Sequence, residues 1–173
     1  MKIKLILPIA TLIIFTTIVF IFFTSSQELN EAPNISLSII DGRKIEINSL
    51  KGNPLLITFW STTCSTCIKE MPHLVELYNQ LNKDGLEIIG IAMFYDSPNR
   101  VLELTRKRAL PYPIALDIEG FASKAFGNVE VTPTSFLIDS YGNIIQQKTG
   151  EMDIEQLRVK IKRLLQTPPT TIS

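Results

Sequence analysis

Cysteine and histidine are scarce in this chain, whose 173 residues include two cysteines and one histidine. Two cysteines cannot build the framework of structural disulfides found in many small exported domains. Zinc needs four protein ligands, or three and a water molecule, so the candidate set is Cys64, Cys67 and His73. Charge of one sign is not in excess either, because 17 basic residues balance 17 acidic ones. The sequence therefore gives no indication of nucleic-acid binding, which needs a clustered basic face.

A long apolar run lies near the N-terminus, where residues 5–23 carry no charged side chain. About 20 such residues cross the core of a bilayer as a helix. Lys2 and Lys4 precede the run and Glu28 follows it, and basic residues prefer the cytoplasmic side. We therefore expect cytoplasmic residues 1–4, a single-pass anchor in the cytoplasmic membrane, and an extracytoplasmic (periplasmic) remainder. The alternative is a signal peptide, although the run exceeds the usual apolar length and no A-x-A cleavage site follows.

The rest of the chain divides into a polar linker over 24–33, a domain over 34–166 and a disordered tail over 167–173. Alternating apolar residues on both sides of Asp41 and Gly42 predict a β-hairpin at the start of the domain. Further strands are expected over 54–60, 86–94, 113–116, 134–139 and 144–149, and helices over 64–82, 101–109, 121–126 and 153–166. This order predicts an α/β fold with a mixed central sheet and helices on both faces.

The two cysteines stand together, with two residues between Cys64 and Cys67, where a predicted strand gives way to a predicted helix. Two thiols at this spacing can close and reopen a disulfide, and the thiolate is the attacking species. The N-terminus of a helix lowers the pKa of a thiol because its unpaired N–H groups and dipole favour an anion. The pair therefore indicates a dithiol/disulfide redox centre.

Two segments resemble the thioredoxin superfamily. Residues 59–72 are similar to its active-site segment, in which a proline, here Pro72, kinks the helix that follows the cysteines, and residues 131–139 are similar to its cis-proline segment. The hairpin, the Glu-Met-Pro sequence at 70–72 and the insert around 97–117 resemble the exported, membrane-tethered TlpA/ResA-type branch. The resemblance implies a thioredoxin-like fold with an N-terminal β-hairpin and a central insert.

The resemblance also implies roles for single residues. Cys64 would be the exposed nucleophile and Cys67 the resolving thiol. Pro133 would be cis and lie against the disulfide, where it aligns a substrate chain and denies the cysteines a metal. The backbone of Thr132 would pair with the incoming polypeptide, and Trp60 would pack beside the site. No organic cofactor and no metal are implied beyond the cysteine pair.

The chain departs from the family pattern at two places. Thr58 stands where thioredoxin has a buried aspartate that relays a proton to the second cysteine. In ResA-like proteins a glutamate takes over this role, and the nearest acid after the next core strand here is Asp96, our hypothesis for a proton relay. Ser65 and Thr66 replace the Gly-Pro of thioredoxin, and since this dipeptide tunes the reduction potential, the potential cannot be carried over.

The sequence thus predicts a monomeric extracytoplasmic thiol-disulfide oxidoreductase that reduces the disulfides of exported client proteins. By resemblance the clients could include apocytochrome c, and a membrane protein would supply the electrons. Three alternatives stay open: the oxidising direction, a non-catalytic binding module or chaperone, and a zinc site formed with His73. A peroxiredoxin is disfavoured because Ile57 occupies the position at which that class has a proline.

Overall fold

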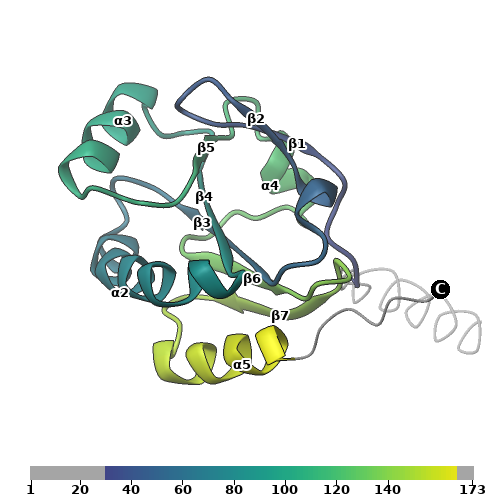
Figure 1. Ribbon diagram of the computed structural model, residues 1–173. Coiled ribbons are helices and arrows are strands. Elements are labelled where there is room, and N and C mark those ends of the chain that lie inside the picture. The colour runs from purple at the N-terminus through teal and green to yellow at the C-terminus, as the bar shows by residue number, and fades with distance from the viewer. Residues whose placement is uncertain (1–29, 167–173) are drawn as a thin grey trace, which may run out of the picture.

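A five-stranded sheet organises the protein in a computed structural model that describes residues 30–166 (Figure 1). The predicted cytoplasmic residues 1–4, the anchor over 5–23, the linker residues 24–29 and the tail over 167–173 lie outside the described residues. Within the described part of the chain, no helix is both long and apolar enough to cross a membrane.

The sheet is built around β3 (Leu55–Trp60), all of whose residues are buried. Its continuous apolar sequence suits a strand that is covered on both faces. It pairs in parallel with β4 (Glu87–Ala92) and antiparallel with β6 (Thr134–Ile138). The short β5 (Ile114–Leu116) and β7 (Ile144–Thr149) complete the order β5-β4-β3-β6-β7. The predicted mixed sheet is therefore confirmed.

An antiparallel hairpin of β1 (Ser36–Ser38) and β2 (Lys44–Glu46) precedes the sheet, as predicted. Its turn contains Gly42 at a φ of 90°, a conformation that favours glycine. The backbone N–H of Ile40 donates to the carbonyl of Ile114 at 2.9 Å. The hairpin therefore covers the edge of the sheet at β5, which would otherwise be unpaired.

Helices cover both faces of the sheet (Figure 1). They are α2 (Ser65–Leu81), α3 (Pro98–Lys107), α4 (Phe121–Ala125) and α5 (Ile154–Gln166), with short 3₁₀ helices η1 (Ile47–Leu50) and η2 (Asn82–Asp84). Side chains of α2, α3 and α5 join one buried apolar cluster. Side chains of α4 and β1 join a second cluster, across the sheet from the first. The predicted placement of helices on both faces is confirmed.

The elements expected over 86–94 and 101–109 differ most from the prediction. The strand expected over 86–94 ends at Ala92, and of the three apolar residues that follow it, Met93 is buried whereas Phe94 and Tyr95 are exposed. The helix expected from residue 101 begins at Pro98. Proline suits the first turn of a helix because the backbone N–H that it lacks would have no partner there. Apolar character alone therefore overestimated the strand and underestimated the helix.

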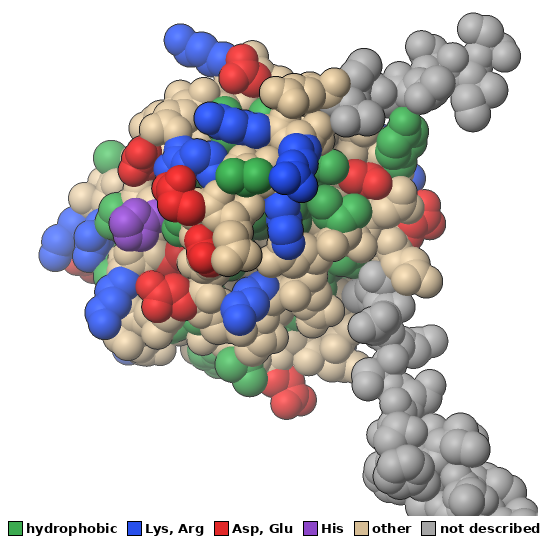
Figure 2. Space-filling view, turned by 90° about the horizontal axis from the view of Figure 1, so that it is seen from below, with side chains coloured by type: hydrophobic (Ala, Val, Ile, Leu, Met, Phe, Trp, Pro, Cys, Tyr) green, Lys and Arg blue, Asp and Glu red, His purple; other side chains and the backbone are tan. Residues whose placement is uncertain are grey.

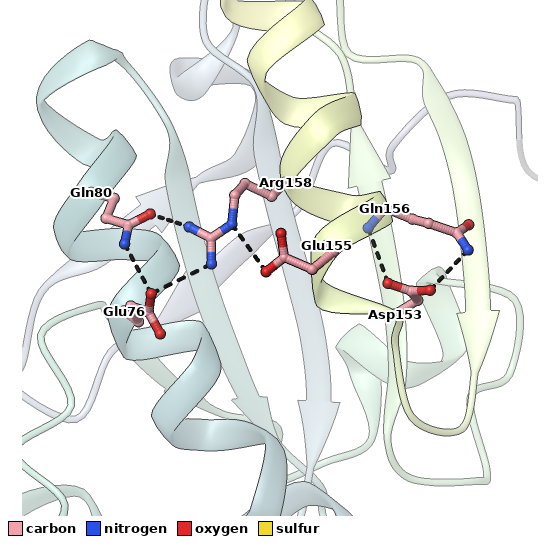
Figure 3. Close-up of polar contacts among 6 residues, drawn as sticks. All are labelled: Glu76, Gln80, Asp153, Glu155, Gln156 and Arg158. Carbon is pink, nitrogen blue, oxygen red and sulfur yellow. Dashed lines mark hydrogen bonds and ion pairs between the residues drawn. The ribbon is translucent and has the colours of Figure 1, made fainter.

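Polar contacts fix α5 beside α2. In Figure 3, Arg158 of α5 reaches Glu76 and Gln80 of α2. The carboxylate of Asp153 accepts hydrogen bonds from the Gln156 backbone N–H at 3.0 Å and from its side-chain amide at 2.8 Å, which caps the start of α5. On the face shown in Figure 2, Lys and Arg side chains are interspersed with Asp and Glu. Polar contacts from Arg158 thus join the C-terminal half of α2 to α5.

Candidate active site

Cys64 and Cys67 lie where β3 gives way to α2, and their sulfur atoms are joined at 2.16 Å. Cys64 is the N-cap of α2, and the Cys67 backbone N–H donates a hydrogen bond to Cys64 Sγ at 3.1 Å. Cys64 is partly exposed, whereas Cys67 is 3% exposed. The two sulfur atoms are therefore unequal: an incoming disulfide can approach Cys64, while Cys67 is shielded behind it.

The predicted proline segment lies against this pair. The peptide bond between Thr132 and Pro133 is cis, and Pro133 is buried directly before β6. The Thr132 carbonyl oxygen is 3.5 Å from Cys64 Sγ. The Gly150 backbone N–H donates to the Pro133 carbonyl at 2.8 Å and holds the segment against the end of β7. The structure thus brings together four residues that the sequence analysis singled out.

Trp60 lies in the core below the site. Its side chain is 2% exposed and belongs to the same buried cluster as Cys67 and Met71. The indole Nε1 is buried without a hydrogen-bond partner, and a Cβ added at Gly90 would lie 3.1 Å from it. Glycine at that position therefore allows the indole to lie directly against β4. Trp60 thus packs beneath the start of α2, in the same cluster as Cys67 and Met71.

Asp96 contacts the loop that carries Cys64. Its carboxylate accepts hydrogen bonds from the backbone N–H of Thr62 and, at 2.7 Å, from the Thr62 hydroxyl. It also accepts the backbone N–H of Ser97 at 3.0 Å. Because Thr62 lies two residues before Cys64, Asp96 fixes the position of the loop that leads to the nucleophile. Cys67 is not among these hydrogen-bond partners.

At the position that carries an aspartate in thioredoxin, the Thr58 hydroxyl pairs with the hydroxyl of Ser135. Thr58 is 3% exposed, and the Ser135 hydroxyl donates to its Oγ1 at 3.0 Å across β3 and β6. These two buried hydroxyl groups therefore satisfy each other within the sheet. This position therefore offers no carboxylate for proton transfer.

A buried carboxyl group that was not predicted from the sequence lies close to the second cysteine along α2. Glu70 is 2% exposed and lies three residues past Cys67 on the buried face of α2. Burial raises the pKa of Glu70, although the Met152 backbone N–H, which donates to its Oε1 at 2.9 Å, acts in the opposite direction. Burial likewise raises the pKa of the neighbouring Tyr112, and the charge of Glu70 adds to that effect. The helical spacing from Cys67 was the available signal, but acidic side chains are seldom buried.

The metal-binding alternative is not formed. His73 lies at an exposed position of α2. Among residues 30–166, no three side chains of His, Cys, Asp or Glu gather closely enough to hold a metal ion. That the protein works without a metal or organic cofactor stays a prediction.

The chain is similar to known proteins over most of its length, and its residues 29–147, which include both cysteines, match the AhpC/TSA family. It is 36% identical over 146 residues to the thiol-disulfide oxidoreductase ResA of Bacillus thuringiensis subsp. konkukian (strain 97-27), with 83% of each chain covered. A crystal structure of a thioredoxin-family thiol:disulfide interchange protein from Chlorobium tepidum TLS is 25% identical, with a TM-score of 0.72 over 82% of this chain and 99% of that one. The crystal structure of StoA from Bacillus subtilis is 28% identical, with a TM-score of 0.63 over 72% of this chain and 93% of that one. These similarities show a thioredoxin-like fold.

Proposed function

Because this chain belongs to the AhpC/TSA family and is a thiol-disulfide oxidoreductase like its ResA-named relatives, we propose that it reduces disulfides of exported proteins. The observation that carries the proposal is the inequality of the two sulfur atoms. Cys64 is accessible at the N-cap of α2, and Cys67 is buried behind it. This arrangement suits a nucleophile and a resolving thiol, the two roles that dithiol exchange requires.

The proposed cycle begins with the reduced protein. The Cys64 thiolate attacks one sulfur of a client disulfide, so that a mixed disulfide forms and the client's other sulfur leaves as a thiolate. Cys67 then loses its proton and attacks Cys64 Sγ, which releases the second client sulfur and closes the Cys64–Cys67 bond. Two electrons pass from the protein to the client. The backbone N–H of Cys67 and the positive end of the α2 dipole favour the thiolate form of Cys64.

The second step needs a proton acceptor for Cys67. Asp96 is the acceptor that the sequence suggested, and it would act through the Thr62 loop that it binds. Glu70 is placed more favourably, because it shares the buried face of α2 with Cys67. We expect Glu70→Gln to slow the decay of the mixed disulfide by about 10- to 100-fold and Asp96→Asn by less than about tenfold. Stopped-flow kinetics of the two variants decides between the acceptors, and the reverse ranking would favour Asp96.

The location and the partners of the protein follow from the apolar run over residues 5–23. We propose that this run anchors the protein in the cytoplasmic membrane, with the domain outside the cytoplasm. The clients are then exported proteins that carry disulfides, and a membrane protein returns electrons to the oxidised pair. Isolated membranes should retain the full chain after a carbonate wash, and an external protease should digest its domain in intact spheroplasts. Release by the wash would contradict the anchor.

The direction of the reaction is tested by the equilibrium reduction potential of the full chain in detergent. A value near about −270 mV, that of thioredoxin, would support a reductant. A value near about −120 mV would make the pair a strong oxidant and reverse the proposed direction. The variant with both Cys64→Ser and Cys67→Ser serves as the control without a redox couple. If the unsubstituted chain showed no reversible couple either, the protein would be a binding module.

A further inference from the structure

Exposed apolar side chains gather at the end of the sheet that carries the dithiol. Eight large hydrophobic side chains are exposed within residues 30–166, and five of them follow β4 or β5 or precede β6 at that end: Phe94, Tyr95, Ile118, Phe121 and Val131. The register places these strand ends together, because Trp60 is opposite Ala92, Ala92 is opposite Leu116, and Phe59 is opposite Thr134. Grouped exposed apolar surface indicates a contact region more often than scattered residues do.

Phe94 and Tyr95 form the aromatic part of this surface, which we call the aromatic ledge. Phe94 is 52% and Tyr95 53% exposed, and their ring centroids lie 5.3 Å apart in an edge-to-face arrangement. A Cβ added at Gly120 would lie 3.5 Å from Phe94 Cδ1, so the Phe94 ring rests on the turn before α4. The two rings therefore support each other and leave their outer sides to solvent.

Hydrogen bonds hold the ledge next to the nucleophile. The Met93 backbone N–H donates to the Trp60 carbonyl at 3.0 Å, and the Asp96 N–H donates to the Met93 carbonyl at 2.9 Å. The Asp96 carboxylate accepts the backbone N–H and the hydroxyl of Thr62. The residues on both sides of the ledge are thus bonded to each other or to the segment that leads to Cys64. Aromatic side chains on a preorganised backbone bind with little loss of conformational entropy.

We propose that the aromatic ledge binds a large apolar side chain next to the reacting cysteine of a client polypeptide. This inference rests on the proposed function and names a feature of its substrates. The occupant is a client polypeptide because the ledge is continuous with the reacting atoms. The ledge is joined to the loop that carries Cys64. Exposed Val131 directly precedes Thr132, whose carbonyl contacts Cys64 Sγ. A client chain bonded to Cys64 is therefore expected to contact these apolar side chains. A small disulfide without a peptide chain does not reach them.

The test compares three substrates of the reduced full chain in detergent: a small aromatic disulfide and two cyclic disulfide peptides that differ only in a leucine or a serine beside one cysteine. The unsubstituted protein is expected to reduce the leucine peptide with a kcat/KM on the order of tenfold above that of the serine peptide. The double variant Phe94→Ser, Tyr95→Ser is expected to lose this preference while keeping its rates on the serine peptide and the small disulfide. Ile145→Ser and Val159→Ser, at exposed apolar positions of β7 and α5, are expected to retain the preference.

A double variant that keeps the leucine preference would overturn the proposal. An equal loss on all three substrates would overturn it too, because the rings would then act on the dithiol rather than on the client. The milder variant Phe94→Leu, Tyr95→Leu keeps apolar surface and is expected to retain part of the preference, which guards against a folding defect. Failure of the unsubstituted protein to reduce any disulfide would instead contradict the proposed function, and the ledge with it.

Discussion

The two ends of the central sheet use their side chains in opposite ways. At the far end, the carboxylate of Asp139 accepts the backbone N–H groups of Tyr141 and Asn143 and the side-chain amide of Asn143, at 2.8–3.0 Å. At the dithiol end, Cys64 remains accessible and five large apolar side chains stay exposed. The far end exposes two large apolar side chains beside this turn, Tyr141 and Ile145, whereas the dithiol end combines five with an accessible sulfur atom. This contrast supports the proposed client recognition at the dithiol end.

The far end is also where the described chain begins. The Ile144 backbone N–H donates to the Asn30 carbonyl at 3.0 Å, and the Ala32 N–H donates to the Gly142 carbonyl at 2.9 Å. Strands of the length of β3 span about 20 Å. Under the proposed anchoring, the polypeptide leaves the domain at the end opposite to the dithiol. Clients and the electron donor then meet Cys64 on the side away from the attachment point.

The largest effect should come from removing the reactive sulfur at the dithiol end. Cys64→Ala is expected to lower the rate of disulfide reduction by at least about a thousandfold, because the thiolate is the nucleophile. The melting temperature of the reduced domain should change little, since Cys64 is only partly buried. A turnover assay together with thermal unfolding under reducing conditions checks both statements. Substantial remaining turnover would move the nucleophile to Cys67.

The matching change at the far end should affect stability and leave the chemistry intact. Asp139→Ala is expected to cost about 1–2 kcal/mol of unfolding free energy, because it leaves the turn N–H groups without their acceptor. The rate of disulfide reduction should stay within about twofold of the unsubstituted protein. Urea unfolding and the turnover assay measure the two quantities. A large loss of turnover in a folded variant would contradict the claim that the far end contributes to stability and not to the chemistry.

A smaller, pH-dependent effect is expected at Glu70. Burial raises the pKa of this carboxyl in the folded protein. The stability that it contributes is therefore fully present below its unfolded pKa and is lost as the pH rises through the folded pKa. Glu70→Gln cannot ionise and keeps an acceptor for Met152, so its melting temperature should gain on that of the unsubstituted oxidised protein between pH 4 and pH 8. The burial of this charge would be contradicted if the melting temperature of the variant minus that of the unsubstituted protein stayed constant or fell with rising pH.

The smallest effect is expected at an exposed ion pair within α5. The Glu155 side chain is 80% exposed and lies 3.5 Å from the Arg158 guanidinium. Glu155→Ala should change the unfolding free energy by less than about 0.5 kcal/mol, because exposed ion pairs are screened by solvent. Chemical denaturation at low and at high salt measures this difference. A loss above about 1 kcal/mol would show that this pair within α5 contributes more than an exposed ion pair should.

The sequence predicted the elements whose burial is visible in the local pattern. The continuous apolar run of β3 and the alternation in the hairpin both led to the observed strands. Phe94 was assigned to the strand over 86–94 because apolar character alone does not tell whether a side chain faces the core or the solvent. The exposure of Phe94 and of Tyr95 follows from the turn after Ala92, where Met93 and Asp96 bond to each other and to the active-site segment.

Contacts between residues far apart in the chain could not be predicted from the sequence. Glu70 was read as part of a tripeptide, and its burial arises because the Met152 backbone N–H, 82 residues away, closes over it. Asp96 was selected for its proximity to the end of a strand, but nothing in the sequence indicated Thr62 as its partner. The roles of Cys64, Cys67, Thr132 and Pro133 came from the family resemblance, and they stay predictions until exchange is measured.

The central claim is that Cys64 attacks the client and Cys67 resolves the mixed disulfide. The most direct test is to express the full chain with Cys67→Ser, trap the mixed disulfides in acid, and locate the bond by mass spectrometry. The account predicts client peptides joined to Cys64, and no trapped client in a Cys64→Ser variant. Clients joined to Cys67 in the Cys64→Ser variant, with none on Cys64 in the first, would contradict it.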